Sequence, residues 1–540
     1  MDGKRFIQVL VPLRLEWVPC YSCDEEVKRG QRVTVSFSGK AYAGVVWNTD
    51  AVPDVAPSRI RKVLKINTEL PSISPQELSF WEFLSTYYLC SPGEVFKAAY
   101  PGSKIRSEQV AASILDRLRS RLAVREEALS RKHKDNVRER LQAERDAIAA
   151  QIEALTRIPE QSAGPKSSAN HTPSRPILLV GPGRHEEYVN RAAEAVQQGL
   201  NVLVLTPEIA ASEQLSALLE QKFPGIVHSL NSHVTDARRR RVAEDLRSFG
   251  GQIVVGTRTS LFLPFSRLGL IIVENEQDVL FKQTEPSPRY NGRDAAVMLG
   301  RIHGASVVLG TPAPSLESLH NALSGKYELL NAGGAVAPVT LIDISVERRK
   351  NGMPGRMSRK LIEAVQRTEG PIALVRGWEK PDEILDEADR FLPGRPIDIF
   401  TFQEARQRDL KGYPLVAVLQ ADALMGGNDF RADERAIQTI AMLREACSGI
   451  LLVQTAKGDH PVFGDTQKVY AALLAEREQW SLPPYTRLVD VTTAGDKQRH
   501  VLPADATLAA RKKEILQAAR QTEQKSGGRT RVIIDVDPVA

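Results

Sequence analysis

Two successive series of short, wholly apolar segments restrict the fold of this chain more than any other feature. The first series is Ile177–Val180, Val202–Leu205, Ile253–Val255, Leu270–Val273 and Val307–Leu309, and the second is Ile372–Val375, Ile397–Phe400, Leu415–Leu419 and Ile450–Val453. Helical stretches separate the segments of each series. Continuous apolar runs of this length are typical of parallel strands in a sheet covered on both faces. The pattern predicts a multidomain α/β protein with two doubly wound lobes in tandem.

The two ends of the chain carry other patterns. Arg32–Phe37 alternates polar and apolar residues, Ser38-Gly39-Lys40 is typical of a tight turn, and Ala43–Trp47 reads as the returning strand. Near the C-terminus, strands at Leu488–Val491 and Val532–Val536 flank a helix. We therefore expect a β-rich N-terminal domain and a small α/β C-terminal domain.

A helical stretch dense in charges of both signs runs from about Glu108 to Arg157. Apolar stripes mark only its two ends, at Leu115, Leu118 and Leu122 and at Ile148, Ile152 and Leu155. This predicts a helical arm or hairpin and not a long coiled coil. Its basic residues fit either a DNA contact or a solvated helix face.

These patterns divide the chain into five predicted parts. They are the β-rich domain at 1–105, the helical arm and a proline-containing linker at 106–170, the first lobe at 171–330, the second lobe at 331–470 and the C-terminal domain at 471–540.

Composition narrows the function classes only slightly. The net charge of +6 over 540 residues is a mild excess that is compatible with a polyanionic partner. We find no apolar run of about 18 residues and no leader-like segment, so we expect no membrane span and no secretion. Four cysteines in so long a chain argue against a disulfide framework and predict a cytoplasmic protein.

Seven short segments follow one another along the chain: Thr206–Ile209, Gly256–Phe265, Phe281–Gln283, Arg289–Asp294, Asp429–Ala436, Leu482–Tyr485 and Asp535–Pro538. The second of them reads GTRTSLFLPF. In sequence and in order, these segments resemble the motifs of the primosomal replication-restart helicases of the PriA family. The resemblance covers nearly the whole chain except the helical arm.

The resemblance implies two RecA-like lobes and a domain over residues 1–105 that binds the 3′ end of a nascent strand at a fork. It makes Trp17, Lys40, Arg258 and Lys282 candidates for DNA binding. Val18 stands where the family has an aspartate that contacts the terminal hydroxyl, so strict 3′-OH recognition is not expected. The implied partners are forked or single-stranded DNA and other primosome or replication proteins, with no membrane, in a nucleoid-associated cytoplasmic location.

The phosphate-binding loop of such a lobe has the pattern G-x-x-x-x-G-K-[ST], with a lysine on the phosphates and a hydroxyl on Mg²⁺. Here the corresponding loop reads Gly181-Pro182-Gly183-Arg184-His185. An arginine replaces the lysine, a histidine replaces the hydroxyl residue, and Pro182 removes one N–H donor. We expect a vestigial loop whose phosphate position is filled by the Arg184 and His185 side chains.

The other catalytic motifs are altered as well. The family's Asp-Glu-Glu-His reads Glu274-Asn275-Glu276-Gln277. Asn275 stands where the residue that polarises the attacking water belongs, and an amide cannot accept a proton near neutral pH. In lobe two, the arginine-finger segment is replaced by Met442–Ser448, in which Arg444 matches neither family arginine without a shift. We expect vestigial positions and no intact catalytic residue.

Metal binding is not expected. Active relatives carry a cysteine-rich zinc module in lobe two, but no cysteine lies between Val375 and Tyr413. Cys20 and Cys23 have zinc-like spacing but no second pair or histidine near them in the sequence. We expect no zinc and no required cofactor, with ATP and Mg²⁺ at most weak ligands.

The sequence favours a PriA-like protein that binds branched or forked DNA in replication restart without hydrolysing ATP. Three alternatives stay open: an active ATP-dependent 3′-to-5′ helicase with a diverged site, a protein-only primosome adaptor, and a sensor that binds ATP without splitting it. A DNA-stimulated ATPase assay separates the first from the favoured interpretation. A salt-dependent fork titration separates the second.

Overall fold

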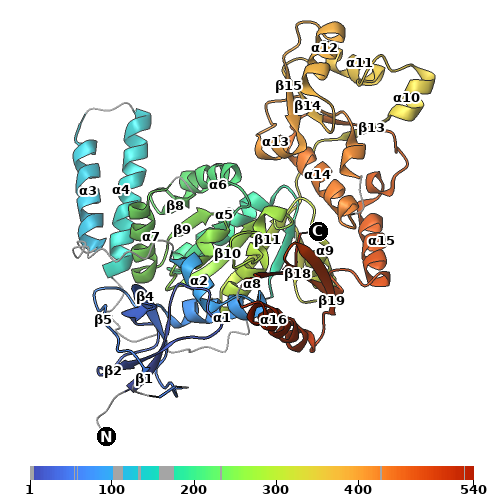
Figure 1. Cartoon of the computed structure of the whole chain (residues 1–540). Helices are drawn as coiled ribbons and strands as arrows, with labels where there is room; N and C mark the ends of the chain where they lie inside the picture. The colour runs from blue at the N-terminus through green and yellow to red at the C-terminus, as the bar shows by residue number, and fades with distance from the viewer. Residues whose placement is uncertain are drawn as a thin grey trace.

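The computed structural model describes residues 5–53, 55–56, 59–100, 114–131, 135–156, 175–231, 234–425, 429–527 and 529–539. It contains an N-terminal β-rich domain, a helical hairpin, two parallel-sheet lobes and a small C-terminal α/β domain (Figure 1). This arrangement confirms the predicted fold class.

The N-terminal domain is an antiparallel five-stranded sheet in the order β2-β1-β4-β3-β5. Its strands are β1 (Arg5–Leu10), β2 (Cys20–Cys23), β3 (Arg32–Phe37), β4 (Lys40–Asn48) and β5 (Lys65–Ile66). Strands β3 and β4 form the predicted hairpin, with Phe37 opposite Lys40. Ser38 and Gly39 both have positive φ in the turn, as the right-handed strand twist favours for a two-residue connection.

Two helices join this sheet to the first lobe, α1 (Pro75–Tyr87) and α2 (Pro92–Ala99). Each begins with a Ser/Glu capping box and a proline in its first turn, which explains where the helices start. Phe80 of α1 packs on Phe262 of the lobe, with ring centroids 5.9 Å apart. The Arg247 guanidinium of the lobe donates to the Tyr100 hydroxyl at 2.6 Å. The N-terminal domain is thus docked on lobe one by both apolar and polar contacts.

The helical hairpin consists of α3 (Ile114–Leu129) and α4 (Asp135–Thr156), and it stands beside the first lobe in Figure 1. Arg125 and Glu144 form an ion pair across it at 2.8 Å. Ile148 is buried. The side chains of Leu115, Leu118, Ile152 and Leu155, and the predicted linker up to residue 174, lie outside the described residues.

The first lobe is a parallel seven-stranded sheet in the order β12-β6-β11-β10-β7-β9-β8. Its strands are β6 (Ile177–Val180), β7 (Asn201–Leu205), β8 (Val227–Leu230), β9 (Ile253–Gly256), β10 (Leu268–Glu274), β11 (Ser306–Thr311) and β12 (Glu328–Asn331). The helices are α5 (Arg184–Gln197), α6 (Ile209–Lys222), α7 (Asp236–Ser248), α8 (Gly292–His303) and α9 (Leu316–Leu323), with the short 3-10 helices η2 (Arg258–Phe262) and η3 (Val279–Phe281). Two separate apolar clusters cover the two faces of the sheet.

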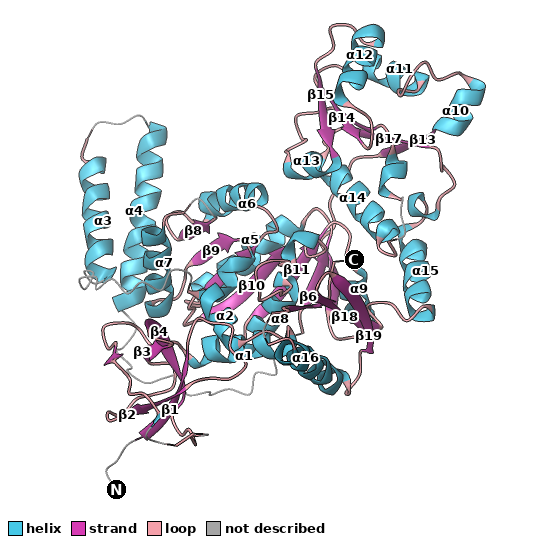
Figure 2. Ribbon diagram, viewed as in Figure 1, coloured by secondary structure: helices cyan, strands magenta, loops and turns pink. Residues whose placement is uncertain are grey.

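The second lobe is a parallel five-stranded sheet in the order β13-β17-β16-β14-β15. Its strands are β13 (Val339–Asp343), β14 (Ile372–Arg376), β15 (Ile397–Thr401), β16 (Leu415–Val418) and β17 (Ile450–Thr455). The helices are α10 (Ile344–Lys350), α11 (Arg359–Arg367), α12 (Pro381–Phe391), α13 (Phe402–Gln407), α14 (Ala432–Ala446) and α15 (Thr466–Gln479), with η4 (Ala421–Leu424) and η5 (Pro461–Phe463). Figure 2 shows α14 and α15 running from this lobe toward the first.

The C-terminal domain is a three-stranded antiparallel sheet in the order β19-β18-β20, crossed by one helix. Its elements are β18 (Thr486–Thr493), β19 (Asp496–Pro503), α16 (Leu508–Lys525) and β20 (Val532–Val536). It lies against the first lobe and near α1 (Figure 1). None of the described helices combines the length and apolar character needed to cross a bilayer.

Candidate functional site

The loop Gly181–His185, expected from the sequence to be a remnant of a phosphate loop, lies at the carboxyl end of β6, where a parallel sheet places its ligands. Gly181 has φ +116°, a conformation that side chains rarely adopt. The Gly183 N–H, which would face a phosphate, donates instead to the Gly333 carbonyl at 3.0 Å. A Cβ at Gly183 would lie 2.3 Å from the Ala332 carbonyl oxygen, and Gly334 packs closely on Pro182. The segment after β12 therefore occupies the mouth of the loop.

Arg184 fills the interior of the site. Its side chain is only 3% exposed, and its Nε and Nη2 bind the Glu274 carboxylate at 3.0 and 2.6 Å. Its Nη1 donates to the Gly181 carbonyl at 3.1 Å and to Glu445 of lobe two at 2.6 Å. The Arg184 side chain thus lies buried at the loop, and the same guanidinium links the two lobes.

Glu274 is the buried centre of this cluster. Besides Arg184, it accepts a hydrogen bond from the Tyr188 hydroxyl at 2.7 Å, and the His185 ring Nε2 lies 3.3 Å away. Burial alone would raise the pKa of Glu274, but Arg184 and His185 outweigh burial and hold that pKa well below its usual range. His185 is 43% exposed, so it covers the site without filling it.

Glu276 and Gln277, two positions of the altered motif, make internal hydrogen bonds. Both Glu276 oxygens are engaged, because they accept the Ser315 N–H at 2.7 Å, the Ser315 and Ser318 hydroxyls and the Arg293 guanidinium. Gln277 accepts the Thr311 hydroxyl at 2.7 Å. A carboxylate whose lone pairs are taken by neutral and cationic donors is a poor ligand for Mg²⁺.

Asn275 differs from its neighbours. It adopts φ +55°, and its side-chain oxygen is buried without a hydrogen-bond partner among the described residues. Asparagine tolerates this conformation better than most residues. The second position of the altered motif thus carries an amide in a left-handed backbone conformation.

Ion pairs and hydrogen bonds join the lobes around the site. Arg431 of lobe two binds Glu317 of lobe one at 2.6 Å, and Arg406 pairs with Asp278. Glu434 of α14 accepts the Leu316 N–H at 2.9 Å. These contacts hold α14 against the first lobe independently of Arg184.

Arg444 does not face the site. Its Nε donates to the Ala337 carbonyl at 3.3 Å, in the segment that links the lobes. The neighbouring Glu445 reaches Arg184 instead. Sequence reasoning missed Glu445 and Tyr188. Tyr188 could have been found, because it lies one helical turn after Arg184 on the same face of α5.

The four DNA-binding candidates fall into two groups. Trp17 is 58% exposed and packs on Phe37 with ring centroids 6.1 Å apart, and Lys40 is exposed at the hairpin turn of the N-terminal sheet. Lys282 is buried, pairs with Asp535 at 2.7 Å and donates to two backbone carbonyls. Arg258 donates to the Leu280 carbonyl at 2.8 Å. Trp17 and Lys40 therefore present their side chains to solvent, Lys282 does not, and Arg258 is half-buried.

The described residues hold no cluster of three or more His, Cys, Asp or Glu side chains placed to bind a metal ion. Cys20 and Cys23 lie at the two ends of strand β2, and neither forms a disulfide with a described cysteine. The expectation of a zinc-free protein stays a prediction.

Comparisons with known proteins point to one family. Residues 8–101 match the family model of the 3′DNA-binding domain (3′BD) of PriA. The chain is 24% identical to the replication restart protein PriA of Rickettsia conorii, over 92% of this chain and 88% of the relative. It is 40% identical to that of Chlamydia pneumoniae, over 32% of this chain and 24% of the relative. A solved structure of RecG bound to a three-way DNA junction is 12% identical, with a TM-score of 0.39 over 74% of this chain and 52% of RecG.

Proposed function

Because this chain belongs to the PriA family of replication restart proteins, we propose that it acts in replication restart by binding forked or single-stranded DNA without hydrolysing ATP. The binding part of this proposal rests on the N-terminal domain, whose residues 8–101 match the 3′DNA-binding domain. Trp17 and Lys40 offer a base-stacking surface and a phosphate contact on that domain, because both are exposed.

One observation carries the absence of ATP hydrolysis: Arg184 occupies the place of the phosphate-binding lysine and directs its donors to Glu274, Glu445 and the Gly181 carbonyl. A nucleotide would have to break this buried cluster before its phosphates could enter. It would also have to displace the Gly333 carbonyl from the Gly183 N–H. Breaking a buried ion pair costs about 3–5 kcal/mol, which opposes nucleotide binding as well as turnover.

In this proposal the two lobes form a fixed platform. Arg184 supplies positive charge between lobe one and lobe two, where a working motor would hold a nucleotide and its metal ion. The lobes then need no nucleotide to stay together. They are free to present a constant surface to DNA and to other primosome proteins.

Two measurements on the full chain test the proposal. Forked DNA should bind with an affinity that falls steeply with salt and varies little with sequence, as expected of phosphate contacts. DNA-stimulated ATP hydrolysis should stay below about 1 s⁻¹, the lower end of the ordinary enzyme range. Turnover above that rate favours an active helicase, and a flat salt response favours a protein-only adaptor. ATP binding without turnover, seen by calorimetry, favours a nucleotide sensor.

A further inference from the structure

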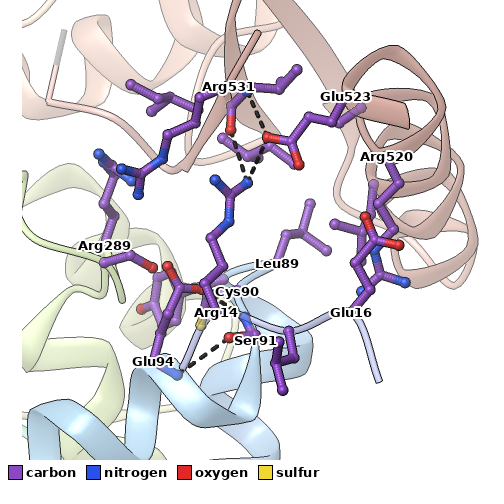
Figure 3. A pocket seen from close by; sticks show the side chains of 18 residues that line it. Arg14, Glu16, Leu89, Cys90, Ser91, Glu94, Arg289, Arg520, Glu523 and Arg531 are labelled. Carbon is purple, nitrogen blue, oxygen red and sulfur yellow. Dashed lines mark hydrogen bonds and ion pairs between the residues drawn. The ribbon is translucent and has the colours of Figure 1, made fainter. Parts of the chain in front are cut away.

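A small cavity lies where the N-terminal domain, the first lobe and the C-terminal domain meet (Figure 3). Its volume of about 60 Å³ gives room for a small oxyanion or a few waters. Its charged lining residues are Arg14, Glu16, Glu94, Arg289, Arg520, Glu523 and Arg531. They come from parts of the chain up to about five hundred residues apart, so the site exists only in the assembled molecule.

The carboxylates of this cavity are already engaged. Glu523 accepts the Arg14 guanidinium at 2.8 Å and the Val532 N–H at 2.7 Å. Glu94 accepts the Ser91 N–H in the capping box of α2. Glu16 accepts the side-chain amide of Gln524 at 3.2 Å. These acids therefore have fewer lone pairs left for the neighbouring arginines.

Two guanidinium groups of the cavity have no such partner among the described residues. Arg520 and Arg531 make no hydrogen bond or ion pair with a described residue, whereas Arg14 is held by Glu523. Figure 3 shows Arg531 and Arg289 toward one side of the cavity and Arg520 toward the other. Arg289 pairs only with Glu285 among the described side chains, and the Glu285 side chain is 77% exposed. Free planar guanidiniums around a small cavity suit the oxygens of a phosphate group.

The surroundings point to a nucleic-acid source for that phosphate. Trp17, one residue after Glu16 of the cavity, exposes its ring to solvent. Exposed aromatic rings beside basic grooves bind single strands by base stacking, largely independently of sequence. The segment from Leu508 to Arg531 adds seven basic and only two acidic side chains. An exposed aromatic ring in the residue next to Glu16 and a mainly basic segment thus accompany the cavity.

We propose that this cavity binds a backbone phosphate of a DNA strand whose base stacks on Trp17, with Arg520 and Arg531 as the phosphate ligands. The inference rests on the proposed function, since it assigns the C-terminal domain a share in DNA binding that begins on the N-terminal domain. The two domains then form one continuous site for a single strand.

The test compares two double variants of the full chain in binding to a labelled single-stranded oligonucleotide. R520A/R531A removes the proposed ligands, and K513A/K525A removes two exposed cations of the same helix that do not line the cavity. Removal of one phosphate contact should lower the slope of log affinity against log salt by about one. We expect R520A/R531A to reduce the slope by about one to two units and the affinity by about tenfold or more at 0.1 M salt. The control should show distinctly smaller reductions in both.

Two further variants sharpen the interpretation. W17A should weaken binding about tenfold without changing the salt slope, because stacking releases no counterions. R520K/R531K should keep the slope, because it keeps the charge. If R520A/R531A and K513A/K525A lost the same affinity for DNA, the inference would be overturned. The same result is expected if the cavity binds an acidic protein segment instead of DNA. If the wild-type chain binds no DNA at all, the proposed function fails instead.

Discussion

The loop at Gly181–His185 and the cavity between the N- and C-terminal domains both contain arginines, but the guanidinium groups have different partners. Arg184 is almost fully buried and binds two carboxylates and a carbonyl. Arg520 and Arg531 line a cavity and bind none of the described residues. The guanidinium nitrogens of Arg184 all donate within the protein itself, whereas the donors of Arg520 and Arg531 are left for a ligand.

This difference separates a structural arginine from a binding arginine more clearly than sequence position does. Arg184 stands in a ligand-binding motif and has become an internal cross-link. Arg520 and Arg531 stand in no motif and make no hydrogen bond or ion pair with a described residue. Whether a guanidinium group already has hydrogen-bond partners decides which of the two roles it can take, and only the folded structure reveals those partners.

The largest expected effect concerns repair of the nucleotide site. R184K, H185T and N275E together restore three of the family residues of lobe one, yet ATP hydrolysis should stay about 10³–10⁵-fold below that of an active helicase. An arginine finger contributes about that factor, and Arg444 donates to the Ala337 carbonyl instead. A coupled-enzyme assay with forked DNA measures the rate.

A matched control places E445R on the same triple variant, which puts an arginine at the position that now reaches Arg184. If the triple variant alone recovers fork-stimulated hydrolysis typical of the family, the lobes reorganise on DNA and the nucleotide site is not committed to a structural role. The contrast between a structural arginine at the Gly181–His185 loop and ligand-binding arginines at the cavity would then no longer hold.

The next largest effect concerns the cross-link itself. R184M leaves Glu274 buried without its main cationic partner, so we expect a loss of about 3–5 kcal/mol in the free energy of unfolding. R191M is the control, because Arg191 lies on the same helix in a partly exposed pair with Glu187 and should cost under about 1 kcal/mol. Urea denaturation followed by circular dichroism measures both. If R184M lost as little stability as R191M, Arg184 would be dispensable for the stability of the two lobes.

Much of the fold was predictable because periodicity reports burial directly. The segments beginning at Ile177, Val202, Ile253, Leu270 and Val307 all became strands of the first sheet. Strands β8 and β12 were missed, since His228 and Ser229 interrupt the first and Glu328 and Asn331 bound the second. Edge strands are only half covered, so their apolar signal is weak.

The sites were predictable only in part. The motif spacing pointed to the loop at Gly181–His185, where the structure places the buried Arg184 side chain against Glu274. It could not identify Glu445, because a contact across two lobes has no local signature. The same motif reasoning chose Lys282 for DNA binding, although this side chain is buried against Asp535. The cavity at Arg520 and Arg531 joins distant segments and follows no family motif, so only the structure could reveal it.

The smallest predicted effect tests whether a buried cation of the C-terminal domain lacks a compensating negative charge. Lys512 of α16 is buried, lies 3.5 Å from the centroid of the Tyr87 ring and makes no ion pair with a described residue. Burial lowers the pKa of Lys512 to about 8 from an ordinary value of 10.5, although Asp537 opposes this shift.

The sign follows from proton linkage. Between pH 8 and 10.5 the unfolded chain holds a proton on Lys512 that the folded chain has released, so unfolding stability attributable to this group rises with pH across that window. K512M removes the burial cost, so its stability relative to the wild type should be highest near pH 7 and should decline by about 1–3 kcal/mol toward pH 10.5. K513M, which changes the adjacent exposed lysine, should run parallel to the wild type. Denaturation of all three proteins at about pH 7, 8, 9 and 10 measures the difference. If the stability of K512M and of K513M changed with pH in the same way, Tyr87 and Asp537 would compensate the buried charge of Lys512 fully. The contrast between a loop whose arginine has all its partners and a C-terminal domain whose cations lack them would then rest on Arg520 and Arg531 alone.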